Sequence, residues 1–235
     1  MLKAILFDLD GTLLPLDEDE FIKAYFGLLC KKFVPLGYDK DELIAGIWQG
    51  TKLMMTNSGK KTNEQVFWDY FYKKFGEDKK AHYPLFDEFY NNEFLQTKAF
   101  CKPNENARKI MDYLKENGVK AVLASRPVFP LNAMVNRAGF VDLKQEDFAL
   151  ITDYSSFHYS KPNPSYYQEI LDKLGLKSND VLMFGNNEEE DGCAQDIGIK
   201  TYMVGDYLIK GKKDRNLTHL TLEEIIPTIK KHLKG

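Results

Sequence analysis

A short apolar run that stops at an acidic turn constrains the fold of this chain more than any other feature. Residues 4–7 read Ala-Ile-Leu-Phe, and the segment Asp8-Leu9-Asp10-Gly11-Thr12 follows directly. A continuous apolar run of this length is typical of a strand buried on both faces, as in parallel sheets covered by helices. The beginning of the chain therefore predicts an inner strand of a parallel sheet that ends at two closely spaced carboxylates.

The second half of the chain alternates between apolar runs and amphipathic helical patterns. We expect strands over 119–124, 148–151, 181–184 and 201–204. Helical patterns cover 104–117, 130–139, 163–174, 221–233 and the segment from the turn at Gly185 to about 198. This alternation predicts an α/β fold, with a Rossmann-like parallel sheet and right-handed crossovers.

Residues 17–97 differ from the rest because their periodicity is helical almost throughout. Breaks at 35–37, 57–59 and 83–84 divide this block into about four helices. The block, counted to residue 98, contains 17 of the 31 aromatic residues, which predicts a bundle with its own aromatic core; an aromatic ligand site is the alternative. We expect a helical cap over 17–97, inserted into an α/β core formed by 1–16 and 98–235.

The composition excludes several classes of protein. Lys and Arg total 32 against 35 Asp and Glu, so no basic excess favours nucleic-acid binding. Three cysteines without CxxC spacing indicate reduced thiols. No apolar run approaches the ~20 residues that span a bilayer, and Asp8 and Asp10 interrupt the first apolar run. We therefore expect a soluble cytoplasmic protein, a monomer or homodimer, with neither a membrane nor a nucleic acid as partner.

Unusual polar residues follow each of four predicted strands. Asp8 and Asp10 follow the first, Ser125-Arg126 the second, Lys161-Pro162 the third, and Gly185-Asn186-Asn187 with the acidic segment 188–191 the fourth. Each group alone has an ordinary explanation as a turn, a helix cap or a solvated charge. In open α/β sheets, however, ligands bind at the carboxyl ends of the strands. The shared edge therefore predicts a site for phosphate and a metal ion.

These loops resemble the motifs of the haloacid dehalogenase-like (HAD) hydrolase superfamily. The first motif is the segment from Phe7 to Leu13, the second ends at Ser125, the third is Lys161-Pro162, and segment 184–191 approximates the fourth. Only about 35 residues separate Ser125 from Lys161, so the inserted helical block resembles the superfamily's C1-type cap. The fourth motif departs from the pattern, because two asparagines follow the glycine in place of an acid.

The resemblance implies a mechanism that agrees with the chemistry of these residues. Asp8 is the expected nucleophile, which forms an aspartyl-phosphate, and Asp10 the expected general acid and base. Lys161 would supply positive charge against the phosphate, and Ser125 a hydrogen bond. The backbone amides of Leu9 and Arg126 are further expected phosphate contacts, while the Arg126 guanidinium is an alternative contact to the substrate.

The resemblance also implies Mg²⁺ as cofactor. Its expected protein ligands are a carboxylate oxygen of Asp8, the backbone carbonyl of Asp10 and a side chain of the fourth motif. Asn186 or Asn187 is the favoured ligand from that motif, with Asp191 as a direct or indirect partner. Glu190 is the alternative position for the second acid.

The expected activity is Mg²⁺-dependent hydrolysis of a phosphate monoester of a small molecule. A phosphomutase, a phosphonate hydrolase that uses Lys52, and a non-catalytic phosphate-binding protein are the alternatives. Two cap stretches, 48–52 and 57–61, either face the substrate or form surface loops. The physiological substrate cannot be read from these motifs, because function is determined by the site and not by the fold.

Overall fold

The computed structural model describes residues 2–234 and contains one six-stranded sheet with the order β3-β2-β1-β4-β5-β6. All five neighbouring pairs are parallel, which confirms the predicted α/β class. The strands are β1 (Ala4–Phe7), β2 (Lys120–Leu123), β3 (Leu150–Ile151), β4 (Val181–Gly185), β5 (Lys200–Val204) and β6 (Thr218–Leu220).

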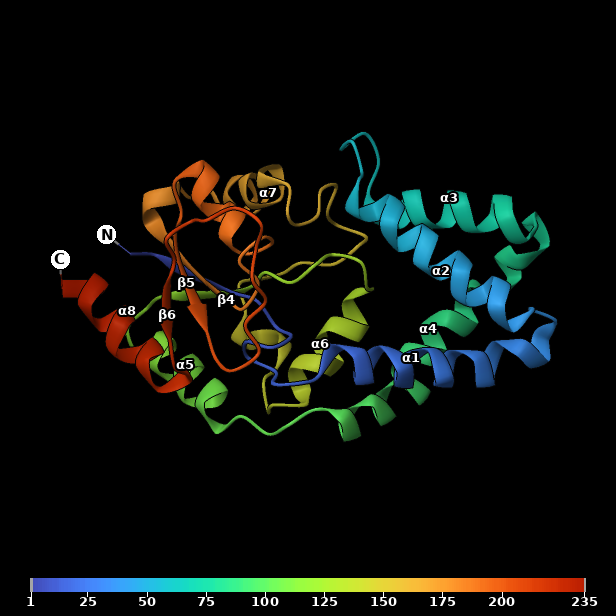
Figure 1. Cartoon of the computed structure of the whole chain (residues 1–235), viewed down its shortest axis with the longest axis horizontal. Helices are drawn as coiled ribbons and strands as arrows, with labels where there is room; N and C mark the ends of the chain where they lie inside the picture. Colours follow the sequence, from blue (N-terminus) through green and yellow to red (C-terminus); the bar gives the residue numbers. More distant parts are fainter. Residues whose placement is uncertain (1, 235) are drawn as a thin grey trace.

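Helices cover both faces of this sheet (Figure 1). Strand β1 alternates between the two cores: Ile5 and Phe7 belong to the larger hydrophobic cluster, and Ala4 and Leu6 to the smaller one. The larger cluster includes residues of α5, α6 and α8, and the smaller one residues of α7. The bounds are α5 (Glu105–Glu116), α6 (Leu131–Gly139), α7 (Pro164–Leu174) and α8 (Ile225–Lys234).

Two expectations for the sheet and its helices were wrong. Strand β6 was not predicted, because its Thr-His-Leu sequence is an edge strand with two exposed residues and no apolar run. The helix expected between Gly185 and residue 198 is instead a turn followed by a short 3-10 helix, η6 (Gly192–Ile197). The other 3-10 helices are η1 (Val34–Leu36), η2 (Glu77–His82), η3 (Glu93–Phe100), η4 (Gln145–Asp147), η5 (Ser178–Asp180) and η7 (Leu222–Glu224).

The inserted block forms α1 (Glu18–Phe33), α2 (Lys40–Met55), α3 (Asn63–Phe75) and α4 (Tyr83–Asn91). These helices gather at the end of the molecule opposite the two termini (Figure 1). Aromatic rings form their interior: Phe33 stacks on Phe86 with ring centroids 4.0 Å apart, and Phe71 packs edge-on against Phe86. The predicted aromatic core is therefore present. No helix among residues 2–234 has the length and apolar character that crossing a membrane requires.

The two chain segments that join the helical block to the sheet run side by side. Leu16 and Cys101 form an antiparallel bridge, and the Lys102 amide donates to the Pro15 carbonyl at 2.8 Å. Farther from this junction, the start of α3 contacts core loops. The Asn63 amide donates to the Phe157 carbonyl at 2.8 Å, and the Asn63 side chain donates to the Pro127 carbonyl at 3.0 Å. The helical block is thus held to the core at this junction and also at the start of α3.

Asn104 is the buried residue that ties the returning segment to the loop after β1. Its Nδ2 donates to the Leu13 carbonyl at 2.8 Å, and its Oδ1 caps α5 by accepting from the Asn106 amide. Asn104→Ala removes both bonds and leaves a buried carbonyl unpaired, so we expect the free energy of unfolding to fall by about 1–3 kcal/mol.

Urea denaturation measures this loss, and Glu105→Ala is the matched control. The Glu105 side chain is 91% exposed, so its removal should change stability by no more than about 0.5 kcal/mol. Equal losses for the two variants would contradict the structural role of Asn104.

Candidate active site

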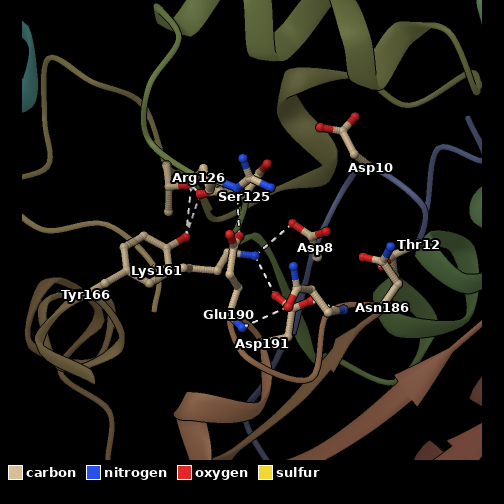
Figure 2. A network of polar contacts seen from close by, with 12 residues as sticks. Asp8, Asp10, Thr12, Ser125, Arg126, Lys161, Tyr166, Asn186, Glu190 and Asp191 are labelled. Carbon is tan, nitrogen blue, oxygen red and sulfur yellow. Dashed lines mark hydrogen bonds and ion pairs between the residues drawn. The ribbon is translucent and has the colours of Figure 1, made fainter. Parts of the chain in front are cut away.

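The register of the sheet brings the predicted loops to one edge. Phe7 pairs with Leu123 on one side and with Phe184 on the other. The residues that follow these three positions therefore lie next to one another, and they include Asp8 and Gly185. Lys161, from the loop before α7, reaches the same place (Figure 2).

A buried lysine between two carboxylates forms the centre of this site. Lys161 Nζ donates to Asp8 Oδ1 at 2.8 Å and to Asp191 Oδ1 at 2.5 Å. The three side chains are at most 10% exposed. Burial is the largest single influence and disfavours the charged lysine, but the attractions of Asp191 and Asp8 together outweigh it and raise the pKa of Lys161. Burial raises the pKa of Asp191 to about 7, against the opposing attraction of Lys161.

Asp10 does not join this cluster. Its carboxylate points away from Asp8 (Figure 2) and forms an ion pair with Arg137 of α6. Arg137 is almost completely buried, and its guanidinium carbon lies 5.0 Å from the ring centre of Phe21 and 5.1 Å from that of Phe129. Sequence reasoning missed Arg137, because an arginine in the last turn of a helix usually reflects the helix dipole.

The predicted phosphate contacts lie around Asp8. Ser125 is buried, and its carbonyl accepts hydrogen bonds from Thr152 Oγ1 at 2.7 Å and Tyr166 OH at 2.8 Å, which hold the loop after β2. Within residues 2–234, the backbone N–H groups of Leu9, Asp10 and Arg126 donate no hydrogen bond. Leu9 is fully buried, and buried N–H groups normally have an acceptor, so these donors suit a bound anion.

The Arg126 guanidinium is occupied by two acids. Its Nε donates to Glu190 Oε2 at 2.6 Å, and its Nη2 donates to Glu18 Oε1 at 3.1 Å. Burial opposes the charge of Arg126, but attraction from Glu190 and Glu18 outweighs it and raises the pKa of the arginine. Glu18 belongs to α1, so Arg126 connects the core to the helical block and does not present an unpaired charge to a ligand.

The two asparagines of the fourth loop have different roles in the structure. Asn187 Oδ1 accepts from the Glu189 and Glu190 amides at 3.0 and 3.1 Å, which shapes the turn where a helix was expected. Asn186 Nδ2 donates to the Tyr207 carbonyl at 2.7 Å, whereas its Oδ1 has only a long contact of 3.4 Å with Thr12 Oγ1. The amide oxygen of Asn187 is therefore occupied by two backbone hydrogen bonds, whereas that of Asn186 is available to another partner.

The donor chemistry at this edge fits Mg²⁺ with few protein ligands. No group of three or more His, Cys, Asp or Glu side chains suited to a metal ion occurs within residues 2–234. Asp8 and Asn186 nevertheless offer a carboxylate and an amide oxygen directly after the adjacent strands β1 and β4. Mg²⁺ in proteins is commonly held by one or two carboxylates, with substrate phosphate and water completing its octahedron.

A cavity of about 130 Å³ extends from Asp8 toward the helical block. Of the cap stretches singled out from the sequence, Trp48 and Thr51 line this cavity, and Lys52 does not. Among the described residues, none of 57–61 lines it. Gly59 in that loop instead lies against the Tyr159 ring of the core.

Removal of the central lysine should destabilise the fold. Lys161→Met leaves the buried carboxylates of Asp8 and Asp191 without their cation, which typically costs about 3–5 kcal/mol of unfolding free energy at neutral pH. The double variant Lys161→Met/Asp191→Asn removes one of the unpaired charges and should recover part of that loss. Urea denaturation of the single and the double variant measures the coupling between Lys161 and Asp191. The exposed Lys60→Met is the control. A double variant no more stable than the single one would contradict this electrostatic account.

Comparisons with known proteins identify the family of this chain. The family described as haloacid dehalogenase-like hydrolase matches residues 5–204. The chain is 24% identical to pyrophosphatase PpaX of Halalkalibacterium halodurans, over 90% of this chain and 86% of the relative. A HAD phosphatase structure from Thermococcus onnurineus has a TM-score of 0.61 at 19% identity, covering 97% of this chain and 98% of that one.

A second solved structure is similar over almost the whole chain. It is a HAD-family enzyme from Bacteroides thetaiotaomicron in complex with magnesium and inorganic phosphate, with a TM-score of 0.53 at 18% identity, covering 91% of this chain and 97% of that one. These structural likenesses support the fold. The family match includes the four loops at the carboxyl edge, and this chain is therefore an enzyme of the haloacid dehalogenase-like hydrolase family.

Proposed function

We propose that this enzyme is a Mg²⁺-dependent phosphatase that hydrolyses a phosphate monoester of a small molecule through an aspartyl-phosphate. One observation carries the proposal: the buried Asp8 carboxylate, in contact with Lys161, lies at the inner end of a cavity. The unpaired N–H groups of Leu9, Asp10 and Arg126 lie on the loops around it. A nucleophile, a fixed cation and anion-binding amides are the parts that phosphoryl transfer requires.

In the first step, a carboxylate oxygen of Asp8 attacks phosphorus and the bond from phosphorus to the alcohol oxygen breaks. The departing alkoxide takes a proton from Asp10, which acts as general acid. Lys161 and the backbone N–H groups offset the charge on the phosphoryl oxygens, and the Ser125 hydroxyl donates to one of them. In the second step, Asp10 removes a proton from water, whose oxygen attacks phosphorus and releases Asp8.

This scheme requires the Asp10 side chain to leave Arg137, because its carboxylate faces away from Asp8 in this structure. Asp10 lies in the loop between β1 and α1, so a turn about its side-chain bonds changes its partner while the strand stays in place. Arg137 therefore holds the acid and base apart from the nucleophile until substrate is bound.

Mg²⁺ would be held by Asp8, the Asp10 carbonyl and Asn186, and it would neutralise charge on the phosphoryl group. Asn187 is the less suitable ligand, because its amide oxygen already accepts two backbone hydrogen bonds. Asp191 acts through Lys161, to which it is bonded. The related structure from Bacteroides thetaiotaomicron, which contains magnesium and inorganic phosphate, supports this choice of ion.

The alternatives have less support. A phosphonate hydrolase would need an amine in the cavity, and Lys52 does not line it. A mutase would require a bisphosphate activator. Steady turnover in an assay without any bisphosphate would therefore exclude a mutase. A non-catalytic binding protein would keep phosphate affinity and show no turnover, so the next experiment also tests that possibility.

Asp8→Asn should abolish hydrolysis of p-nitrophenyl phosphate in Mg²⁺, because the nucleophile is lost. The melting temperature should change little, since the new amide oxygen can still accept from Lys161 and Asp191 keeps its charge. Asp10→Asn should slow turnover by about 10²–10⁴-fold, since only proton transfer is removed. Steady-state kinetics and mass spectrometry of the trapped phosphoenzyme distinguish the two roles. Activity above a few per cent of the unaltered enzyme in Asp8→Asn would refute the nucleophile assignment, and an unchanged kcat in Asp10→Asn would refute the acid–base role.

Calorimetric titration with Mg²⁺ tests the ligand assignment in the fourth loop. Asn186→Asp adds a carboxylate at the proposed ligand position, so Mg²⁺ affinity should rise by roughly 10-fold. Asn187→Asp is the matched control: its oxygen still accepts the same two N–H bonds, so affinity should change little. A larger gain for Asn187→Asp, or equal gains, would show that the ligand has been assigned to the wrong residue.

A further inference from the structure

We propose that the cavity between the core and the helical block is a subsite for a single aromatic ring carried by the substrate alcohol. This inference rests on the proposed phosphatase function and names the class of substrate: a phosphate monoester of an alcohol that carries one phenyl-sized apolar ring and no second anionic group. Three properties of the cavity support it: its lining, its charge and its size.

Aromatic residues are the largest class in the lining. Rings from all four helices of the helical block and from one core loop surround the space, namely Phe26, Trp48, Phe67, Trp68, Tyr90 and Phe129. The same cavity is lined by Asp8 and Ser125 at its catalytic end. A phosphoryl group held at Asp8 would therefore leave its alcohol pointing among these rings. Aromatic pairs in offset or edge-on arrangements gain free energy beyond area burial alone.

The charge of the cavity excludes a second anionic group on the substrate. Two cationic side chains, Arg126 and Arg137, are among its described lining residues. Arg126 is paired with Glu18 and Glu190, and Arg137 with Asp10. A carboxylate or second phosphate on the alcohol would meet these acids with no unpaired cation nearby, and a buried unpaired charge is strongly unfavourable.

Hydroxyl groups on the substrate would also bind poorly. The hydroxyls of Tyr25 and Tyr90, two polar groups of the cavity wall, are bonded to each other at 3.1 Å. A sugar-like alcohol would lose its hydrogen bonds to water and find few replacements among the surrounding rings. The lining thus favours an apolar alcohol over a polyol.

The volume leaves no room for more than one ring. The whole cavity measures about 130 Å³ and its catalytic end must also hold the phosphoryl group, whereas an apolar cavity that accommodates benzene alone measures roughly 150 Å³. A fused two-ring system exceeds this space and would require the helical block to shift. Since α3 is bonded to the core through Asn63, such a shift would break the contacts with Phe157 and Pro127.

Four substrates with primary alkyl leaving groups test the subsite: ethyl, 2-phenylethyl, 2-(1-naphthyl)ethyl and glycerol 1-phosphate, each with Mg²⁺. Because the leaving alcohols have similar acidity, differences in kcat/KM report binding of the alcohol. We expect 2-phenylethyl phosphate to exceed ethyl phosphate by about 10-fold or more, and to exceed the naphthyl and glycerol esters. Values for phenylethyl and ethyl within twofold of each other, or a preference for the glycerol ester, would overturn the inference.

A bulky substitution on α2 tests whether the preference for the phenyl ester arises in this cavity. Thr51→Trp fills the cavity and should reduce the ratio of kcat/KM for phenylethyl over ethyl phosphate toward one. Ala45→Trp adds the same ring at an exposed position of α2 that does not line the cavity, and should keep the ratio. If Thr51→Trp does not fold, Trp48→Ala, at a side chain 47% exposed, should lower the same ratio. A ratio unchanged in the folded cavity variant would overturn the inference.

Failure of the function and failure of the subsite give different results. Hydrolysis of all four esters without preference refutes the subsite alone. If no ester is hydrolysed, the phosphatase proposal is refuted. Calorimetric titration with 3-phenylpropylphosphonate and with propylphosphonate then tests the subsite independently, by comparing the affinities of the two compounds. Tighter binding of the phenyl compound by about 10-fold or more supports the ring site, and equal binding overturns it.

Discussion

The contact of one buried lysine with two carboxylates is the interaction on which the rest of this site depends. Lys161 can remain charged in the interior only because Asp8 and Asp191 accept from it at 2.8 and 2.5 Å. A buried charge without such partners would be unfavourable by several kcal/mol. The parallel register that places the ends of β1 and β4 side by side is therefore also an electrostatic requirement, because it brings these groups together.

Two paired arginines extend the same principle into the cavity. Arg126 joins an acid of α1 to an acid of the fourth loop, and Arg137 holds Asp10. Each cation is already paired with an acid of the protein, so the polar end of the cavity binds the phosphoryl group and no second anion. The aromatic end contributes through burial of apolar area. This division of the cavity connects the proposed chemistry to the proposed class of alcohol.

Much of the site could be predicted from the sequence, because buried parallel strands are continuous apolar runs and their loops share one edge. Asp8 and Lys161 were recognisable on that basis. The choice between Asn186 and Asn187 was not, since it depends on which amide oxygen the backbone of the turn uses. The role of Arg137 could not be predicted, because its partner Asp10 lies more than a hundred residues away in the sequence. Strand β6 was missed because an exposed edge strand has no apolar pattern.

The pairing of Leu16 with Cys101 has a consequence for the architecture as a whole. The helical block leaves and rejoins the sheet at one point, so for the core it is topologically a single long surface loop. A loop whose ends already meet adds little closure entropy as it lengthens. The helical block can therefore be exchanged for another of different shape without altering the strand order, and the identity of the substrate can change while the reaction stays the same.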